Sequence, residues 1–212
     1  MKLSEISRVG SSIALLTHTP NDLSVLHHAQ TQMPDGFSPI VGVNLQAIAN
    51  AAEMAALLTH ELATAKIIIL RVLGRLASVP GFAELVRHAQ SQGRHLIAVS
   101  GTGEPDPELA AVSTVTPDVL QLALGYFQAG GSVNLVQLLR YLSDHFLLTG
   151  YGFEQAVALP EQGLYHPDLA EGAGINDWLA HRVPQQPSVG CPGAAEPSWI
   201  EHRTRRAGCM PV

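Results

Sequence analysis

The sequence contains ten histidines, the side chains that most readily bind a metal ion or transfer a proton near neutral pH. His27 and His28 are adjacent, so in a strand they would point to opposite faces and could not easily share an ion. His60 and His88 fall in expected helices, and neither has another histidine or a cysteine three or four residues away. We therefore interpret the histidines as surface or boundary residues, and the sequence predicts no metal site.

Gly101-Thr102-Gly103 follows an expected strand, which is where phosphate-binding loops also occur. The loop lacks the third glycine of a dinucleotide fingerprint and the Gly-Lys-Ser/Thr of a P-loop, and Pro105 and Pro107 disfavour a helix that starts at once. The chain also shows no Ser-His-Asp order, no paired carboxylates and no Cys-rich motif. The sequence therefore predicts no catalytic residue, and a nucleotide-dependent enzyme that uses this loop is the least favoured function.

A general rule of open parallel sheets still indicates a place for a ligand, because such sheets bind ligands outside the carboxyl ends of their strands. The expected ends lie near His18, Gly74 and Gly101, which are the candidate ligand-binding residues. Gly74 would either allow a ligand to approach the backbone closely or simply end its strand, and the second role is favoured. This rule predicts a location and no chemistry.

Composition excludes some classes of partner. The net charge of −6 disfavours nucleic-acid binding, which needs a basic surface to neutralise phosphates. Charged residues make up 14% of the chain, so its surface is either rich in small polar residues or partly covered by another structure.

The first apolar segment, residues 13–16, is too short for a signal peptide or a membrane span, so we expect a cytoplasmic protein without a membrane partner. Cys191 and Cys209 are expected to be free thiols rather than a disulfide.

The element expected to organise the fold is KIIILRVLG, residues 66–74. A β-branched run that ends on glycine is typical of a buried strand in a parallel sheet. Residues 23–29 fit either a strand or a helix that continues to Gln32. The alternation of strands and helices predicts an α/β domain with a parallel sheet of the Rossmann or flavodoxin type. Further strands are expected over residues 13–18, 95–100 and, weakly, 38–45, and helices over residues 46–66 and 82–92.

The pattern changes after residue 115. Two apolar helices joined at Gly130-Gly131 predict an antiparallel helical hairpin against the sheet. A short helix is expected around residues 177–181, and the proline-rich and glycine-rich end of the chain predicts an irregular, disordered tail. The expected organisation is therefore an α/β head with its helical hairpin (1–150), an extended linker (151–183) and the tail (184–212).

Four stretches, in this order, resemble a known family. They are KIIILRVLG itself, the run AVSGTGEPDPEL (98–109), YFQAGGSVNL (126–135) and GLYHPD (163–168). Together they resemble the N-terminal region of the large subunit of aerobic cobaltochelatase (CobN type), a relative of the magnesium chelatase large subunit. The similarity extends over roughly residues 11–190.

This resemblance implies a ligase that inserts cobalt into a tetrapyrrole, hydrogenobyrinic acid a,c-diamide, with ATP during aerobic cobalamin biosynthesis. In that family, separate AAA+ type subunits hydrolyse the ATP, and the metal-inserting residues lie in domains beyond the region that this chain resembles. Cobalt and ATP are therefore expected at the level of the full complex, with no cofactor bound by this segment. The alternative is a non-catalytic α/β binding or interaction module.

The chain departs from the family pattern at two places. Arg75 stands where family members tend to have a second glycine. After Gly190 the family would enter another apolar strand, whereas this chain continues with CPGAAEPSW. This change of composition suggests a truncated gene product with a frame-shifted tail, and a natural short paralogue is the alternative.

Overall fold

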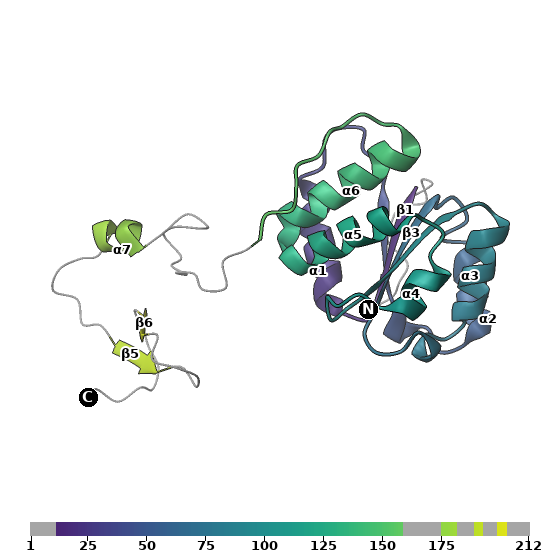
Figure 1. The fold of residues 1–212 in the computed structure, drawn as a ribbon, viewed down its shortest axis with the longest axis horizontal. Helices are drawn as coiled ribbons and strands as arrows, with labels where there is room; N and C mark the ends of the chain where they lie inside the picture. The colour runs from purple at the N-terminus through teal and green to yellow at the C-terminus, as the bar shows by residue number, and fades with distance from the viewer. Residues whose placement is uncertain (1–11, 159–174, 182–188, 193–198, 203–212) are drawn as a thin grey trace. The chain divides into compact units, whose positions relative to one another are not determined.

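The computed structural model describes residues 12–158, 175–181, 189–192 and 199–202. The chain divides into two compact units, Met1–Leu159 and Pro160–Val212. The first unit contains a parallel sheet with strand order β2-β1-β3-β4, which confirms the predicted α/β class (Figure 1). The strands are β1 (Ile13–Thr17), β2 (Ile40–Asn44), β3 (Ile67–Val72) and β4 (His95–Ser100).

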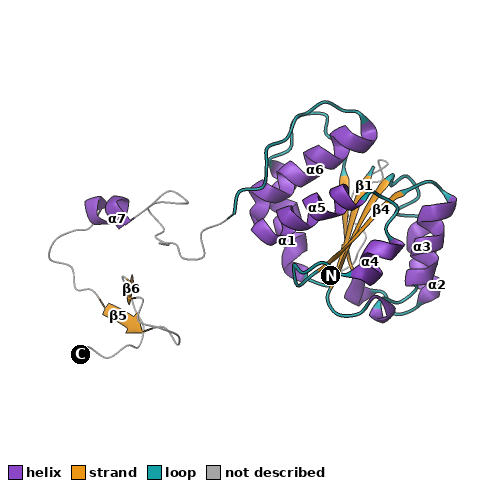
Figure 2. Cartoon of the chain, in the orientation of Figure 1, coloured by secondary structure: helices purple, strands orange, loops and turns teal. Residues whose placement is uncertain are grey.

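Helices cover both faces of this sheet (Figure 2). Side chains alternate along β3: Ile67 and Ile69 face α1, α5 and α6, whereas Ile68, Leu70 and Val72 face α2, α3 and α4. All five of these apolar side chains are buried, as the unbroken apolar run predicts. The helices are α1 (Pro20–Thr31), α2 (Ala51–Thr59), α3 (Phe82–Ser91), α4 (Pro107–Val112), α5 (Pro117–Ala129) and α6 (Gly131–Leu147).

The ambiguous segment 23–29 lies inside α1, so the helical interpretation is confirmed and the strand interpretation is wrong. Pro20 begins the helix, where its missing N–H and fixed φ cost nothing, and Asp22 places a carboxylate in the positively polarised first turn. Leu26 and Ala29 are buried and mark the side of the helix that packs on the core. These start signals outweigh the alternating apolar residues that suggested a strand.

The predicted helix over residues 46–66 is wrong in its bounds, because α2 spans only nine residues. The side-chain oxygen of Asn50 accepts a hydrogen bond from the Glu53 N–H and caps the start of the helix. Before it, the Asn44 side chain accepts from the Gln46 N–H and stabilises a separate 3₁₀ turn, Leu45–Ala47. Local side-chain caps therefore divide a segment whose residues all have good helix propensity.

A short helix, α4, was not expected after the Gly101 loop. Asp106 accepts hydrogen bonds from the N–H groups of Glu108 and Leu109, and Pro107 occupies the first helical position. The prolines thus begin this helix instead of preventing it. Ser113 and Thr114 follow it and hydrogen-bond to the outer edge of β4, including Thr114 N to Leu96 O at 2.9 Å. They cover an edge that would otherwise be free to pair with another strand.

The two helices joined at Gly130-Gly131, α5 and α6, are confirmed. Both glycines have φ in the left-handed region, +68° and +77°, where a side chain would be strained. Apolar side chains on one face of α6 are buried against the sheet and α1. They are Leu135, Leu138, Leu139 and Leu142.

Residues 149–157, which we call the strap, run along α5 and α6 and are fastened to them mainly through backbone atoms. Asn134 is the main anchor: its side-chain amide donates to Val157 O at 2.8 Å and its oxygen accepts from Val157 N at 2.9 Å. Glu154 N donates to the Gln137 side chain at 2.9 Å, and the Tyr126 hydroxyl donates to Glu154 O. The first residues of the expected linker are therefore part of the first unit.

Asp144 fixes the start of the strap, and its pKa should make the stability of this segment depend on pH. Burial alone would raise the pKa of Asp144, but hydrogen bonds from Thr149, Tyr151 and Gly152 to the carboxylate outweigh it and lower the pKa. A lowered folded-state pKa stabilises the fold above the unfolded-state pKa, and this contribution is lost as the pH falls through the folded value.

We therefore expect Asp144→Asn to destabilise the protein at pH 7, and the difference from the parent to shrink towards about pH 2 to 3. Urea denaturation at both pH values measures this difference. The exposed Asp35→Asn is the control for the loss of one negative charge. A destabilisation by Asp144→Asn that stays constant with pH would contradict the role assigned to the carboxylate.

In the second unit, the structure describes a helix, α7 (Ile175–His181), which agrees with the short helix expected there. It also describes two antiparallel strands, β5 (Val189–Pro192) and β6 (Trp199–His202), within the segment expected to be disordered. The rest of the expected tail, and most of the expected linker after residue 158, lie outside the described residues. Among the helices that the structure describes, none is long and apolar enough to cross a lipid bilayer.

Candidate functional site

The three residues predicted from the strand ends lie at the carboxyl edge of the sheet. His18 follows β1, and its Nδ1 accepts a hydrogen bond from the Leu73 N–H at 3.3 Å. Gly101 follows β4 and donates from its N–H to Val72 O at 2.7 Å. Both therefore contact the end of β3. Burial lowers the pKa of His18, which favours its neutral form.

Gly74 has a φ of +89°, and a Cβ added there would meet no heavy atom within 4 Å. Backbone conformation, and not close approach of another group, therefore explains this glycine in the described structure. This agrees with its interpretation as a residue that ends a strand.

Gly101 differs from Gly74, because a Cβ at Gly101 would lie 2.7 Å from Leu73 Cδ2 and 3.1 Å from Val72 O. We expect Gly101→Ala to lower the free energy of unfolding by about 1 kcal/mol, since the half-exposed Leu73 side chain can move but the backbone oxygen yields less. Urea denaturation measures this effect. In a Leu73→Ala background the cost should fall, and an equal cost in both backgrounds would contradict the steric explanation.

The same edge contains a charged residue that the sequence predictions did not single out. Arg71 is the one charged residue of β3, and its side chain lies on the same face of the sheet as Ile67 and Ile69. Its partner in the parallel register of β1 is Thr17. The chain leaves β1 towards β2 and leaves β3 towards β4, so Arg71 lies where the strand order reverses. Ligands bind at such reversal points in doubly wound folds.

Arg71 forms an ion pair with Asp22 in the first turn of α1, through Nη1 and Oδ1. The exposed fractions of the two side chains are 17% and 10%, so the pair is largely removed from water. Arg71 Nη2 also donates to Gly101 O at 3.2 Å. The guanidinium carbon lies 4.9 Å from the centre of the Phe127 ring, a cation–π distance.

Thr17 completes this network. Its hydroxyl donates to Asp22 Oδ2 at 2.6 Å and accepts from the Thr19 N–H at 3.0 Å. The side chain of Thr17 is fully buried. The end of β1 thus holds the Asp22 carboxylate in place for Arg71, and the contacts of Asp22 with Thr17 and Arg71 fasten α1 to the centre of the sheet.

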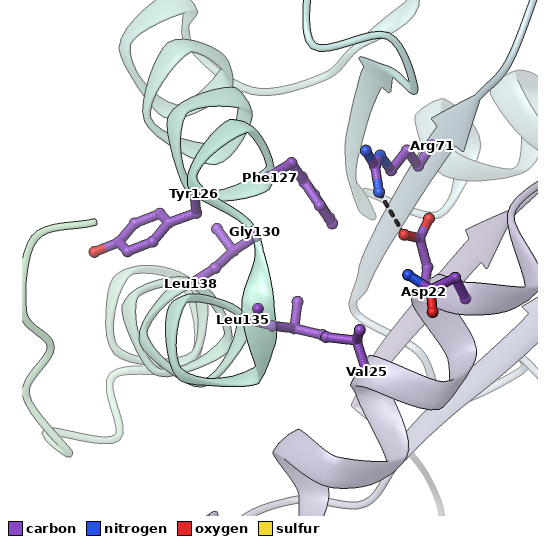
Figure 3. Close-up of a pocket in the computed structure, with 10 residues that line it drawn as sticks. Asp22, Val25, Arg71, Tyr126, Phe127, Gly130, Leu135 and Leu138 are labelled. Atoms are coloured by element: carbon purple, nitrogen blue, oxygen red, sulfur yellow. Dashed lines mark hydrogen bonds and ion pairs between the residues drawn. The ribbon is translucent and has the colours of Figure 1, made fainter. Parts of the chain in front are cut away.

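A pocket of about 210 Å³ lies beside this ion pair. Figure 3 shows Arg71 and Asp22 facing each other at one side of it, with Phe127 and Leu135 at the other side. One wall is therefore polar and the opposite wall is apolar. The lining residues are Asn21, Asp22, Val25, Arg71, Tyr126, Phe127, Gly130, Gly131, Leu135 and Leu138.

The pocket is equipped for binding rather than for proton transfer. The charged pair offers hydrogen-bond donors and acceptors, and the apolar wall offers contact area. Within the described part of the chain, no group of three His, Cys, Asp or Glu side chains is placed to hold a metal ion. Of the residues predicted from the strand ends, Gly101 accepts a hydrogen bond from the Arg71 guanidinium through its carbonyl oxygen, and His18 donates from its N–H to the Arg71 backbone oxygen at 3.4 Å. A single arginine in an otherwise apolar strand is the sequence signal that could have revealed the site.

Comparisons with known proteins agree with the family resemblance. No protein-family model matches the chain. The chain is 27% identical over 188 residues to the aerobic cobaltochelatase subunit CobN of Pseudomonas aeruginosa, covering 88% of the chain and 15% of that subunit. It is 29% identical over 180 residues to the CobN subunit of a Sinorhizobium species, covering 80% of the chain and 14% of that subunit.

A solved structure shows the same relation. The catalytic subunit of cobaltochelatase from Mycobacterium tuberculosis matches this chain with a TM-score of 0.57 and 28% identity, and the match covers 72% of this chain and 12% of that subunit. These relatives are subunits, and therefore components of a multi-subunit enzyme. The resemblance found in the sequence motifs is thus confirmed: the chain is similar to the CobN subunits of cobaltochelatase, and it spans about 15% of the length of the curated relatives.

Proposed function

We propose that this chain forms a domain of an aerobic cobaltochelatase large subunit. In that setting it takes part in the ATP-dependent insertion of cobalt into hydrogenobyrinic acid a,c-diamide. The observation that carries the proposal is the combined similarity: 27% identity over 88% of the chain to one CobN subunit, and a TM-score of 0.57 to a cobaltochelatase catalytic subunit.

The role of the domain is in assembly or in enclosing the tetrapyrrole. The described residues of the sheet edge provide an ion pair and a pocket, which suit binding and positioning. In this proposal, AAA+ type partner subunits hydrolyse the ATP and other domains of the large subunit insert the metal.

A chimeric subunit tests this proposal. The present chain would replace the matching segment of the Pseudomonas aeruginosa CobN subunit, and cobalt insertion would be followed by the absorbance of the tetrapyrrole in the presence of partner subunits and ATP. We expect activity within about tenfold of the parent, whereas deletion of the segment should abolish it. A chimera that folds and assembles but is as inactive as the deletion would refute the proposed role.

The pocket supports a second candidate, a binding module that acts without a chelatase. Titration of the 212-residue chain with hydrogenobyrinic acid a,c-diamide, read together with the chimera assay, distinguishes the two. Absorbance of the tetrapyrrole should shift on binding if the domain encloses substrate. A chain that fails both this titration and the chimera assay would favour the module.

A further inference from the structure

We propose that the pocket between α1, β3 and the α5–α6 junction binds a primary carboxamide carried on a short apolar chain. The inference concerns the chemistry of the pocket alone and does not depend on a role in cobalt insertion. It follows from the unused hydrogen-bonding capacity of the ion pair, from its charge balance, and from the shape and polarity of the walls.

The donors come from Arg71, whose guanidinium carries five N–H groups. Within the described part of the chain it makes two hydrogen bonds, to Asp22 Oδ1 and to Gly101 O. Nε is buried and has no acceptor among the described residues. The second N–H of Nη1 and the second N–H of Nη2 also have no acceptor among the described residues, and Arg71 lines the pocket, so an acceptor that enters the pocket can pair with them.

The acceptors come from Asp22. One carboxylate oxygen accepts from Arg71 and the other accepts from Thr17. An ionised carboxylate has room for about four hydrogen bonds, so each oxygen can take one more. Donors and acceptors therefore lie side by side along the polar wall. A primary carboxamide has the complementary arrangement, because its C=O and NH₂ groups are adjacent.

Charge balance selects the amide over an ion. Arg71 and Asp22 together have no net charge, and both line the pocket. The two charges lie side by side. A carboxylate ligand that pairs with Arg71 would therefore also lie close to Asp22, and an ammonium ligand that pairs with Asp22 would also lie close to Arg71. Each ion would thus meet a like charge in a largely desolvated place. A neutral amide uses both partners without this repulsion.

The other wall and the volume define the rest of the ligand. Leu135 and Leu138 provide an apolar surface opposite the ion pair, and Val25 adds apolar surface next to Asp22 on α1 (Figure 3). The cavity of about 210 Å³ is many times larger than the roughly 10 to 15 Å³ that a single water molecule needs. This space fits the amide together with a chain of a few carbons, as in butyramide. An ion pair that served only to attach α1 to β3 would need no such space.

Titration of the ¹⁵N-labelled full chain with butyramide, butyrate and butylammonium tests the ligand class. NMR cross-peaks of the Arg71 Nε–H and of the Gly131 amide report on the pocket. We expect saturable shifts with butyramide in the millimolar range, and affinities at least about tenfold lower for the two ions. Equal or tighter binding of either ion, or shifts with butyramide that never saturate, would overturn the proposal.

Two variants test whether the ion pair sets this preference. Asp22→Asn leaves Arg71 without a counter-charge, so butyrate should become the better ligand by about tenfold. Val25→Phe fills part of the pocket while retaining the ion pair, and it should abolish binding of butyramide. The matched control is His27→Phe, an exposed residue of the same helix that does not line the pocket. Binding to Val25→Phe equal to that of the control would refute the site even if Asp22→Asn fails to fold.

Discussion

Arg71→Met is expected to lower the free energy of unfolding by about 3 kcal/mol, because it leaves the Asp22 carboxylate largely buried and unpaired. The exposed fraction of the Asp22 side chain is only 10%, so water cannot fully replace the guanidinium. The substitution also removes the hydrogen bond to Gly101 O and the cation–π contact with Phe127. Urea denaturation of both proteins measures the difference.

Arg75→Met is the matched control, since Arg75 is exposed and follows the same strand. It should change stability by less than about 0.5 kcal/mol. The double variant Arg71→Met/Asp22→Leu should regain part of the loss, because it removes the unpaired charge as well. Equal effects of Arg71→Met and Arg75→Met would show that the ion pair does not stabilise the fold.

Leu70→Ala is expected to cost about 3 to 4 kcal/mol by leaving a cavity at the centre of the sheet. The Leu70 side chain is fully buried, and its register partners are Leu16 in β1 and Ala98 in β4. Strands pack on both sides and helices cover this face, so the surrounding side chains can close little of the space. The midpoint and slope of urea denaturation give the change in free energy.

Leu73→Ala provides the comparison for Leu70→Ala, because it removes the same atoms from a side chain that is 44% exposed. Its cost should be about 1 kcal/mol or less. If the two substitutions destabilised the protein equally, β3 would not be the buried centre that the register describes.

Local sequence patterns were sufficient for much of the fold. The apolar run of β3 and the pattern of β4 predicted buried parallel strands, and Gly130-Gly131 predicted the junction of two helices. Each of these signals lies within one element and depends on burial or on backbone conformation alone. The same kind of signal failed at residues 46–66, where the caps formed by Asn44 and Asn50 outweighed a continuous helical propensity.

The location of the site was only partly predictable. The rule about carboxyl ends of strands indicated the edge at which the Arg71 network and its pocket lie, and Gly101 does contact that network. His18 and Gly74 lie at the same edge but do not line the pocket. Asp22 immediately precedes the segment 23–29, whose secondary structure was ambiguous, so its carboxylate could not be assigned to a helix face.

By itself, the sequence determined the succession of strands and helices and the similarity to cobaltochelatase large subunits, because both are properties of short ordered stretches. Only the tertiary structure decided that Arg71 meets Asp22, which lies 49 positions away, and that α1 and the α5–α6 junction enclose a pocket beside them. The physical reason is that this contact depends on the strand order and on the face that each helix covers. Neither of these is encoded in the periodicity of a single element.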